Sequence, residues 1–144
     1  MAVASRPLIV LAGPIHPAGH ELLEAEARVV VCEDLTEPGV VRAAGEADGI
    51  LFRNRPPVSE TLMAACKTLR VVGRYGAGLD IVDLPAATRL GIAVVHAPGA
   101  NSQSVAEHAV MLILNCVKKT RVVDRMTRAG DWSPTRYRGI VDTI

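Results

Sequence analysis

Short apolar runs alternate with segments of helical composition through the first two thirds of the chain. A run that lacks a polar residue at every second position is typical of a parallel strand buried on both faces of its sheet. The alternation therefore predicts an α/β fold, a flavodoxin-like doubly wound sheet of five parallel strands joined by right-handed crossovers. The predicted strands are Leu8–Leu11, Val29–Val31, Ile50–Phe52, Val71–Val72 and Ile92–Val95, and the predicted helices between them are Ala18–Ala27, Thr36–Ala47, Ser59–Cys66 and Leu84–Leu90.

A long helix is predicted to follow the sheet, from about Ser104 to Arg128. Ser104 and Glu107 have the spacing of a capping box at its start, and Gly130 stands where a glycine often ends a helix. The first turns of this helix are apolar on most faces, whereas its second half is polar. A helix that is apolar nearly all round requires partners on more than one side. The tail, residues 131–144, has little periodicity and is predicted to be a loop.

Composition and charge exclude several classes of function. The net charge of +1, without a run of basic residues, gives no basis for binding nucleic acid or an anionic membrane. The early apolar stretch, Leu8–Ala12, is too short to span a membrane and makes a poor signal peptide. The cysteines Cys32, Cys66 and Cys116 contain no Cys-x-x-Cys pair, so we expect three reduced thiols and no metal site. These features favour a cytoplasmic globular protein.

Two neighbouring strands of the predicted sheet end in glycine-containing turns, Gly76–Gly78 and Ala97–Asn101. Ligands of open parallel sheets bind at the carboxyl ends of the strands, where glycine lets a ligand approach bare backbone N–H groups. The first turn differs from a dinucleotide loop, because Ile81 stands at the position of the third glycine and Asp80 adds negative charge. Two interpretations of this turn remain open. Either its N–H groups cradle a carboxylate, or its glycines only tighten the exit of the strand.

The same residues resemble a known family, the D-isomer-specific 2-hydroxyacid dehydrogenases. The resemblance rests on Arg53 after the third strand, the run Arg74–Asp80, the turn Ala97–Asn101 and the run Ser104–His108. It implies that residues 1–99 are the N-terminal portion of a substrate domain, and that residues 100–144 are a linker and the first helix of a nucleotide-binding domain that is otherwise missing.

The resemblance also implies roles for particular residues. Substrate-binding roles fall on Arg53, Asn54, Gly76, Ala77, Gly78 and Asn101, and cofactor contacts on Ala77 and Ser104. The family's catalytic His, Glu and Arg would lie beyond residue 144, so none of His16, His20, His96 and His108 matches the catalytic histidine. Of these four, His96 lies nearest to the predicted cleft.

Two functions follow as hypotheses. In the first, the chain is the substrate-binding portion of an NAD- or NADP-dependent enzyme that acts on a small 2-hydroxy or 2-oxo acid. The chain alone is then expected to have no turnover and little affinity for the cofactor. In the second, the chain is a non-catalytic fragment that forms a homodimer through helix 104–128, or pairs with a full-length relative to regulate it.

A flavodoxin or a receiver module would share the predicted sheet but not its site. A receiver requires acidic residues at the ends of the first and third strands, where this chain has Ala12-Gly13 and Arg53-Asn54. The loop Gly13–Pro17 has few N–H donors for a flavin phosphate, because its prolines lack them. The sequence therefore disfavours both modules.

Overall fold

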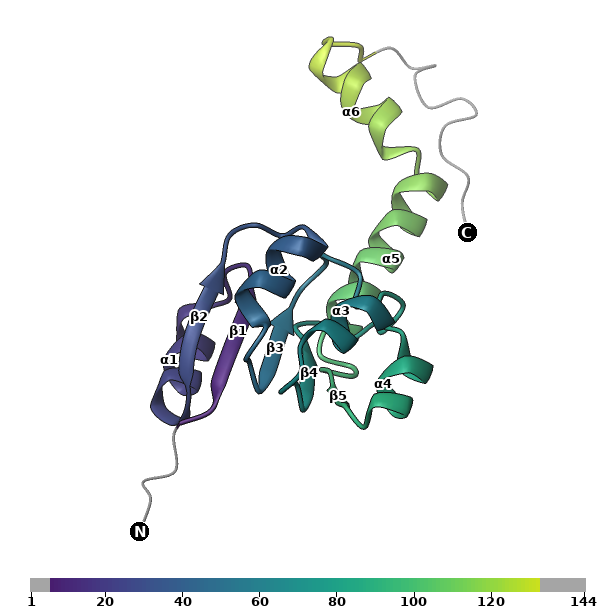
Figure 1. Ribbon diagram of the computed structural model, residues 1–144. Helices are drawn as coiled ribbons and strands as arrows, with labels where there is room; N and C mark the ends of the chain where they lie inside the picture. The colour runs from purple at the N-terminus through teal and green to yellow at the C-terminus, as the bar shows by residue number, and fades with distance from the viewer. Residues whose placement is uncertain (1–5, 133–144) are drawn as a thin grey trace. The chain divides into compact units, whose positions relative to one another are not determined.

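The computed structural model describes residues 6–132, which divide into two compact units after Ala100. The first unit holds a parallel sheet of five strands in the order β2-β1-β3-β4-β5 (Figure 1). This is the flavodoxin-like order, so the predicted fold class is confirmed. The strands are β1 (Leu8–Ala12), β2 (Arg28–Cys32), β3 (Gly49–Phe52), β4 (Val71–Arg74) and β5 (Ala93–Val95).

Each crossover helix of the first unit begins at a residue that favours a helix start. The hydroxyl of Ser59 caps the third crossover helix by accepting a hydrogen bond from the N–H of Leu62 at 3.1 Å. Asp83 accepts from the N–H of Ala86 at 2.9 Å in the same way. Proline lies in the first turn of three of the four helices, where its missing N–H has no cost. The helices are α1 (Pro17–Glu26), α2 (Glu37–Ala44), α3 (Glu60–Ala65) and α4 (Leu84–Leu90).

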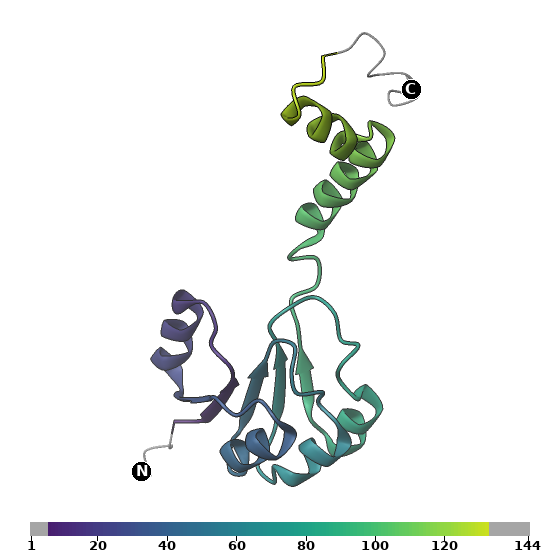
Figure 2. The same ribbon diagram turned by 90° about the horizontal axis from the view of Figure 1, so that it is seen from above.

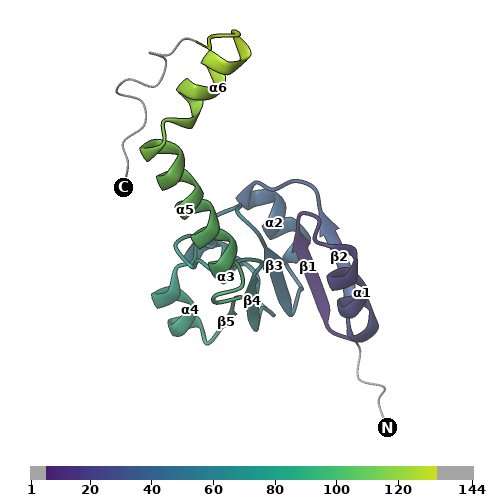
Figure 3. The same ribbon diagram turned by 180° about the vertical axis from the view of Figure 1, so that it is seen from behind.

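The two faces of the sheet are covered unequally. Helices α2, α3 and α4 lie on one side and α1 on the other (Figure 2). The core lies under α2–α4, where Phe52 and Leu62 are each 1% exposed. On the opposite face, α1 lies near β1 and β2, and no other helix of the first unit covers β3, β4 or β5 (Figure 3). The expectation of strands buried on both faces was wrong for the edges, since Val30 of β2 and Val95 of β5 are 42% and 55% exposed.

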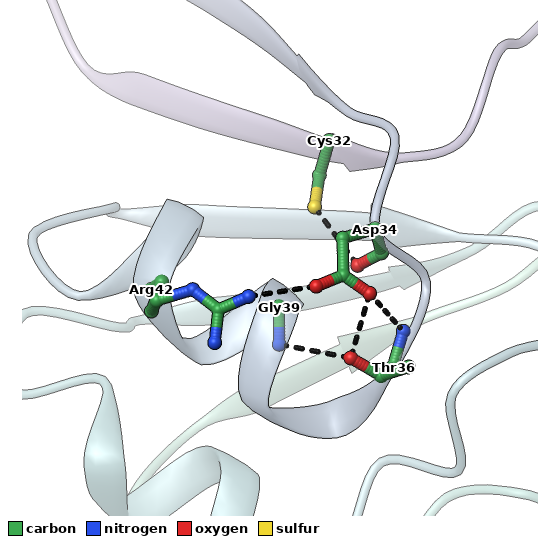
Figure 4. Close-up of polar contacts among 5 residues, drawn as sticks. All are labelled: Cys32, Asp34, Thr36, Gly39 and Arg42. Carbon is green, nitrogen blue, oxygen red and sulfur yellow. Dashed lines mark hydrogen bonds and ion pairs between the residues drawn. The ribbon is translucent and has the colours of Figure 1, made fainter.

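Asp34 organises the turn between β2 and α2 (Figure 4). One carboxylate oxygen accepts hydrogen bonds from the Thr36 hydroxyl at 2.7 Å and the Thr36 N–H at 3.2 Å, and the other accepts from Arg42 at 2.7 Å. Thr36 in turn caps α2 by accepting from the N–H of Gly39 at 3.2 Å. Hydrogen bonds from Thr36, followed by the Arg42 guanidinium, lower the pKa of Asp34 below its usual value. A side chain at position 39 would collide with Asp34, because a Cβ there would overlap both its carboxylate and its backbone oxygen.

The described part of the second unit, up to residue 132, consists of two helices, α5 (Ser102–Val117) and α6 (Thr120–Arg128). The prediction of one continuous helix over 104–128 was therefore wrong. Lys119 has a φ of 48°, a left-handed conformation that breaks the helix where its apolar half ends.

The ends of these helices also differ in part from the predicted ones. The prediction of a capping box at Ser104 and Glu107 was wrong, because the helix begins after Asn101 and no side-chain hydrogen bond caps it. The Glu107 carboxylate accepts a hydrogen bond from the Gln103 side chain instead. The predicted glycine end is confirmed, since Gly130 has a φ of 71° and its N–H donates to Thr127 at 3.0 Å. The predicted loop from residue 133 onward lies outside the described residues.

Between residues 6 and 132, no helix combines the length and the apolar character needed to cross a bilayer. No group of three or more metal-ligating side chains occurs in this part of the chain either.

Candidate functional site at the carboxyl ends of β3, β4 and β5

Strand pairing brings the carboxyl ends of three neighbouring strands together at one end of the sheet. Phe52 of β3 is paired with Arg74 of β4, and Gly73 of β4 is paired with Val95 of β5. Arg53 therefore leaves β3 beside the residues that leave β4. We call residues 75–78 the β4 turn, and it lies between the exits of β3 and β5 because β4 lies between these strands.

Backbone hydrogen bonds hold the β4 turn from both sides. On the β3 side, the Tyr75 N–H donates to the Phe52 carbonyl at 2.8 Å. On the β5 side, the Ala97 N–H donates to the Gly76 carbonyl at 3.0 Å. The Gly76 N–H itself donates to the Arg74 carbonyl at 2.8 Å. Gly76 was predicted to bind substrate, and this prediction is not tested; its own amide is used by the internal bond within the turn.

The amides of Ala77 and Gly78 have no hydrogen-bond partner within the described residues. The carbonyls of the two peptide units that carry these amides, those of Gly76 and Ala77, accept bonds from Ala97 and His96, at 3.0 and 2.8 Å. A trans peptide unit points its C=O and its N–H in opposite directions. Both free N–H groups therefore point away from the segment after β5. Two consecutive amides on one side of a turn form a cradle for an anion such as a carboxylate.

At two positions of the β4 turn, Gly76 and Gly78, the space that a side chain would take is occupied by a neighbouring charged group. A Cβ at Gly76 would lie 2.8 Å from the Arg74 guanidinium, and a Cβ at Gly78 would lie 2.8 Å from the Asp80 carboxylate. A side chain at either position would force one of these groups to move. The glycines therefore allow charged side chains to pack directly against the backbone of the turn.

Arg74 joins the β4 turn to the exit of β3. Its Nη1 donates to the Tyr75 carbonyl at 2.8 Å, its Nη2 donates to Oδ1 of Asn54 at 3.3 Å, and its guanidinium lies 5.9 Å from the centre of the Phe52 ring. Its Nε is buried without a partner. Because Oδ1 of Asn54 is occupied, the NH₂ group of that amide remains to donate to a ligand. Sequence reasoning included Arg74 in the family motif but assigned it no role, since its contacts depend on strand pairing.

Arginine side chains are concentrated at the carboxyl ends of β3 and β4. Arg53 and Arg55 are exposed, and no hydrogen bond or ion pair holds the Arg53 side chain within the described residues. Together with Arg74 they place three guanidinium groups on the residues that end β3 and β4. A free guanidinium can bind a carboxylate through two parallel hydrogen bonds. The arrangement suits a small organic anion held by backbone amides and an arginine.

The other predicted site residues lie in the second unit. Asn101 directly precedes α5 and Ser104 lies in its first turn, and both are exposed. The first unit brings together Arg53, Asn54 and the residues of the β4 turn, whereas the roles of Asn101 and Ser104 stay predictions.

An apolar groove opens beside α1, on the face of the sheet that carries this helix, and Leu23 of α1 lines one side of it. Its volume is about 330 Å³, and Ile9, Leu51 and Val71 line its floor. Tyr75 and His96 also line it, next to the β4 turn. The site thus combines polar donors at the strand exits with an apolar surface beside them, a combination typical of small-molecule sites.

The remaining histidines serve elsewhere. The Nδ1 of His16 accepts from the N–H of Ala18 at 3.3 Å and so caps α1. His20 lies 3.4 Å from the carboxylate of Glu24 on the same helix. His108 is exposed on α5. His96 was predicted to lie nearest to the cleft, but the sequence does not show its contact with Ala77, which joins residues 19 positions apart in the chain.

Comparisons with known proteins bear on the family and the fold of the chain. A model of the D-isomer specific 2-hydroxyacid dehydrogenase catalytic domain matches residues 9–136. D-3-phosphoglycerate dehydrogenase of Archaeoglobus fulgidus is 32% identical over 133 residues, which are 92% of this chain and 25% of that enzyme. D-3-phosphoglycerate dehydrogenase 2 of Arabidopsis thaliana, a chloroplastic enzyme, is 34% identical over 94% of this chain and 22% of its own length. The chain thus spans about a quarter of the length of the curated relatives that it matches.

A crystal structure of a Pyrococcus horikoshii protein superposes with a TM-score of 0.81 and 27% identity, over 96% of this chain and 42% of that one. The agreement over nearly the whole chain shows that the arrangement of strands and helices is one that occurs in solved proteins.

Proposed function

The chain belongs to the D-isomer specific 2-hydroxyacid dehydrogenase family, and we propose that its first unit binds the carboxylate of a 2-hydroxy or 2-oxo acid. The observation that supports this proposal is the pair of free amides of Ala77 and Gly78, which point away from the β5 exit. The exit of β3 lies on the other side of β4, and it carries Arg53 and the Asn54 amide. We assign the carboxylate to the two N–H groups and the Arg53 guanidinium, with Asn54 as a further donor.

The proposed substrate is D-3-phosphoglycerate or a related 2-hydroxy acid, after the relatives named above. Its phosphate adds negative charge, which further arginines at the carboxyl ends of β3 and β4, Arg55 and Arg74, would favour. In a full-length enzyme, the chemistry would be hydride transfer between the hydroxy acid and NAD or NADP. The residues of this chain would orient the acid through its carboxylate and so present its C2 atom in a fixed direction.

The β4 turn does not fit the pyrophosphate of a dinucleotide. Ile81 stands at the position where a dinucleotide loop has its third glycine. Ala77 and Ser104 remain the proposed contacts of a nicotinamide cofactor in this chain, because the family resemblance implies them.

Calorimetric titration of the purified chain with D-3-phosphoglycerate and with D-lactate tests the carboxylate site. Arg53→Ala is expected to weaken binding about tenfold or more, because it removes a hydrogen-bonded charge. Arg70→Ala is the matched control. Arg70 is an exposed arginine that directly precedes β4, at the opposite end of this strand from the proposed site. Equal losses in the two variants would show that only general charge attraction is measured, and would overturn the proposal.

A second proposed function rests on the second unit. Six large apolar side chains of α5 are between 45% and 61% exposed: Val105, Val110, Met111, Leu112, Ile113 and Leu114. Exposed apolar surface of this extent marks an interaction site in soluble proteins. We propose that the segment 104–128 pairs two copies of the chain, or one copy with a full-length relative. Sedimentation equilibrium tests this, and a chain that stays monomeric up to high concentration would exclude it.

A further inference from the structure

His96 contacts the β4 turn at the peptide unit that carries one of the two free amides. Its Nδ1 lies 2.8 Å from the Ala77 carbonyl oxygen. The imidazole is exposed on the segment that leaves β5, so solvent or a ligand can reach its other nitrogen. The adjacent Ala97 N–H holds the preceding carbonyl, that of Gly76, at 3.0 Å. The side chain and the backbone of the β5 exit therefore hold two consecutive peptide units of the turn.

The contact fixes the tautomer of His96. A carbonyl oxygen only accepts hydrogen bonds, so the hydrogen of a neutral His96 is on Nδ1. The Ala77 carbonyl and the Gly78 N–H belong to one peptide unit. A hydrogen bond to the carbonyl polarises that unit and makes its N–H a stronger donor. It also restrains the rotation of a unit that ends in glycine, the residue with the greatest backbone freedom.

From this geometry we propose that His96 is a positioning residue of the carboxylate site, one that orients and polarises the Gly78 amide without touching the substrate itself. The inference rests on the proposed function, because it needs an anion at the amides of Ala77 and Gly78. It also assigns the two sides of the β4 turn different tasks. The β5 exit aims the amides through His96 and Ala97, while the β3 exit supplies the charged donor Arg53.

Three variants test the role of His96 in the titration with D-3-phosphoglycerate. His96→Ala is expected to weaken binding about threefold to tenfold, the effect of one neutral hydrogen bond. His96→Asn is expected to bind within about twofold of the unaltered chain, because its side-chain NH₂ can donate to the same carbonyl. His20→Ala is the control, since it removes a half-buried imidazole from α1 and leaves the β4 turn intact. All three variants are expected to melt like the unaltered chain, because His96 and its replacements lie at the surface.

A spectroscopic measurement separates positioning from simple stabilisation. Nitrogen-15 NMR of the imidazole is expected to show the hydrogen on Nδ1 of neutral His96, and the Gly78 amide resonance is expected to move in His96→Ala without any ligand. A hydrogen on Nε2, or equal affinities of His96→Ala and the unaltered chain, would overturn the inference. If Arg53→Ala loses binding while His96→Ala does not, the inference fails and the proposed function stands. If the unaltered chain binds no acid, both fail.

Discussion

The two units of the chain differ in where their apolar side chains lie. In the first unit, a sheet and three helices enclose a core, and Leu62 is 1% exposed. In the second unit, none of the residues of α5 and α6 is buried, and Leu112 is 49% exposed. A parallel sheet with crossover helices gives its own apolar residues partners, whereas a pair of helices leaves most of one helix surface uncovered. The first unit should therefore unfold cooperatively alone, and the second should depend on partners for its stability.

The largest expected difference is in the free energy of unfolding, when one leucine in each unit is replaced by alanine. Leu62→Ala should lower the free energy of unfolding by about 2–5 kcal/mol, because it leaves a cavity in the core. Leu112→Ala should change it by less than about 0.5 kcal/mol in dilute solution, because the side chain is half exposed. Urea unfolding monitored by circular dichroism measures both, and equal effects would contradict the proposed difference between the units.

Cysteine reactivity compares the units without a substitution. Cys32 and Cys66 of the first unit are 6% and 3% exposed, whereas Cys116 of α5 is exposed. Burial also raises the pKa of the Cys66 thiol, which lowers the fraction of reactive thiolate. Cys116 should react with a thiol reagent on the order of a hundred times faster than Cys66, since Cys66 reacts only when the core opens. Mass spectrometry of partly labelled protein identifies the site, and comparable labelling of Cys66 would argue against a closed core.

Two glycines in left-handed conformations sharpen the comparison further. Gly91 ends α4 with a φ of 70° and Gly130 follows α6 with a φ of 71°, and a Cβ at either position would meet no neighbouring atom within 4 Å. Gly91→Ala should destabilise the first unit by about 1–2 kcal/mol through backbone strain alone. Gly130→Ala adds the same local strain but should leave the unfolding of the first unit unchanged. Urea unfolding measures both variants, and a loss of first-unit stability in Gly130→Ala would show that the two units unfold together.

The smallest expected effect concerns pH. The folded pKa of Asp34 lies below its unfolded value, so its stabilising contribution is present above the unfolded pKa and is lost as pH falls through the folded pKa. Asp34→Asn should therefore lose less stability than the unaltered chain when the pH falls into the acidic range. Asp124→Asn, at an exposed pair with Arg128 in α6, is the control and should leave the pH dependence of the first unit unchanged. Urea midpoints at several pH values provide the measurement, and parallel curves for Asp34→Asn and the unaltered chain would contradict it.

Much of the fold could be predicted from the sequence because its signals are local. Uninterrupted apolar runs mark the strands, Ser59 marks the start of α3, and Gly130 marks the end of α6. The break between α5 and α6 was missed because Lys119 carries no such signal, although it adopts the left-handed conformation usually taken by glycine or asparagine.

The site was predictable in its residue types but not in its hydrogen bonds. Glycines after a strand indicate a turn with accessible amides, and the family resemblance adds Arg53. The sequence cannot show that the Gly76 amide bonds to Arg74 while those of Ala77 and Gly78 stay free, because these bonds depend on how the turn closes. The roles of Arg74 and His96 depend likewise on the pairing of β3, β4 and β5.

The most direct test of the account is a nitrogen-15 NMR titration of the backbone amides with D-3-phosphoglycerate. The amides of Ala77 and Gly78 are expected to shift most, and that of Gly76 to shift less because it already donates to Arg74. Arg53→Ala should weaken the response at the same two amides. Saturating acid that leaves Ala77 and Gly78 unmoved, or that shifts residues at the opposite edge of the sheet around Arg70 instead, would contradict the assignment of the carboxylate to the β4 turn.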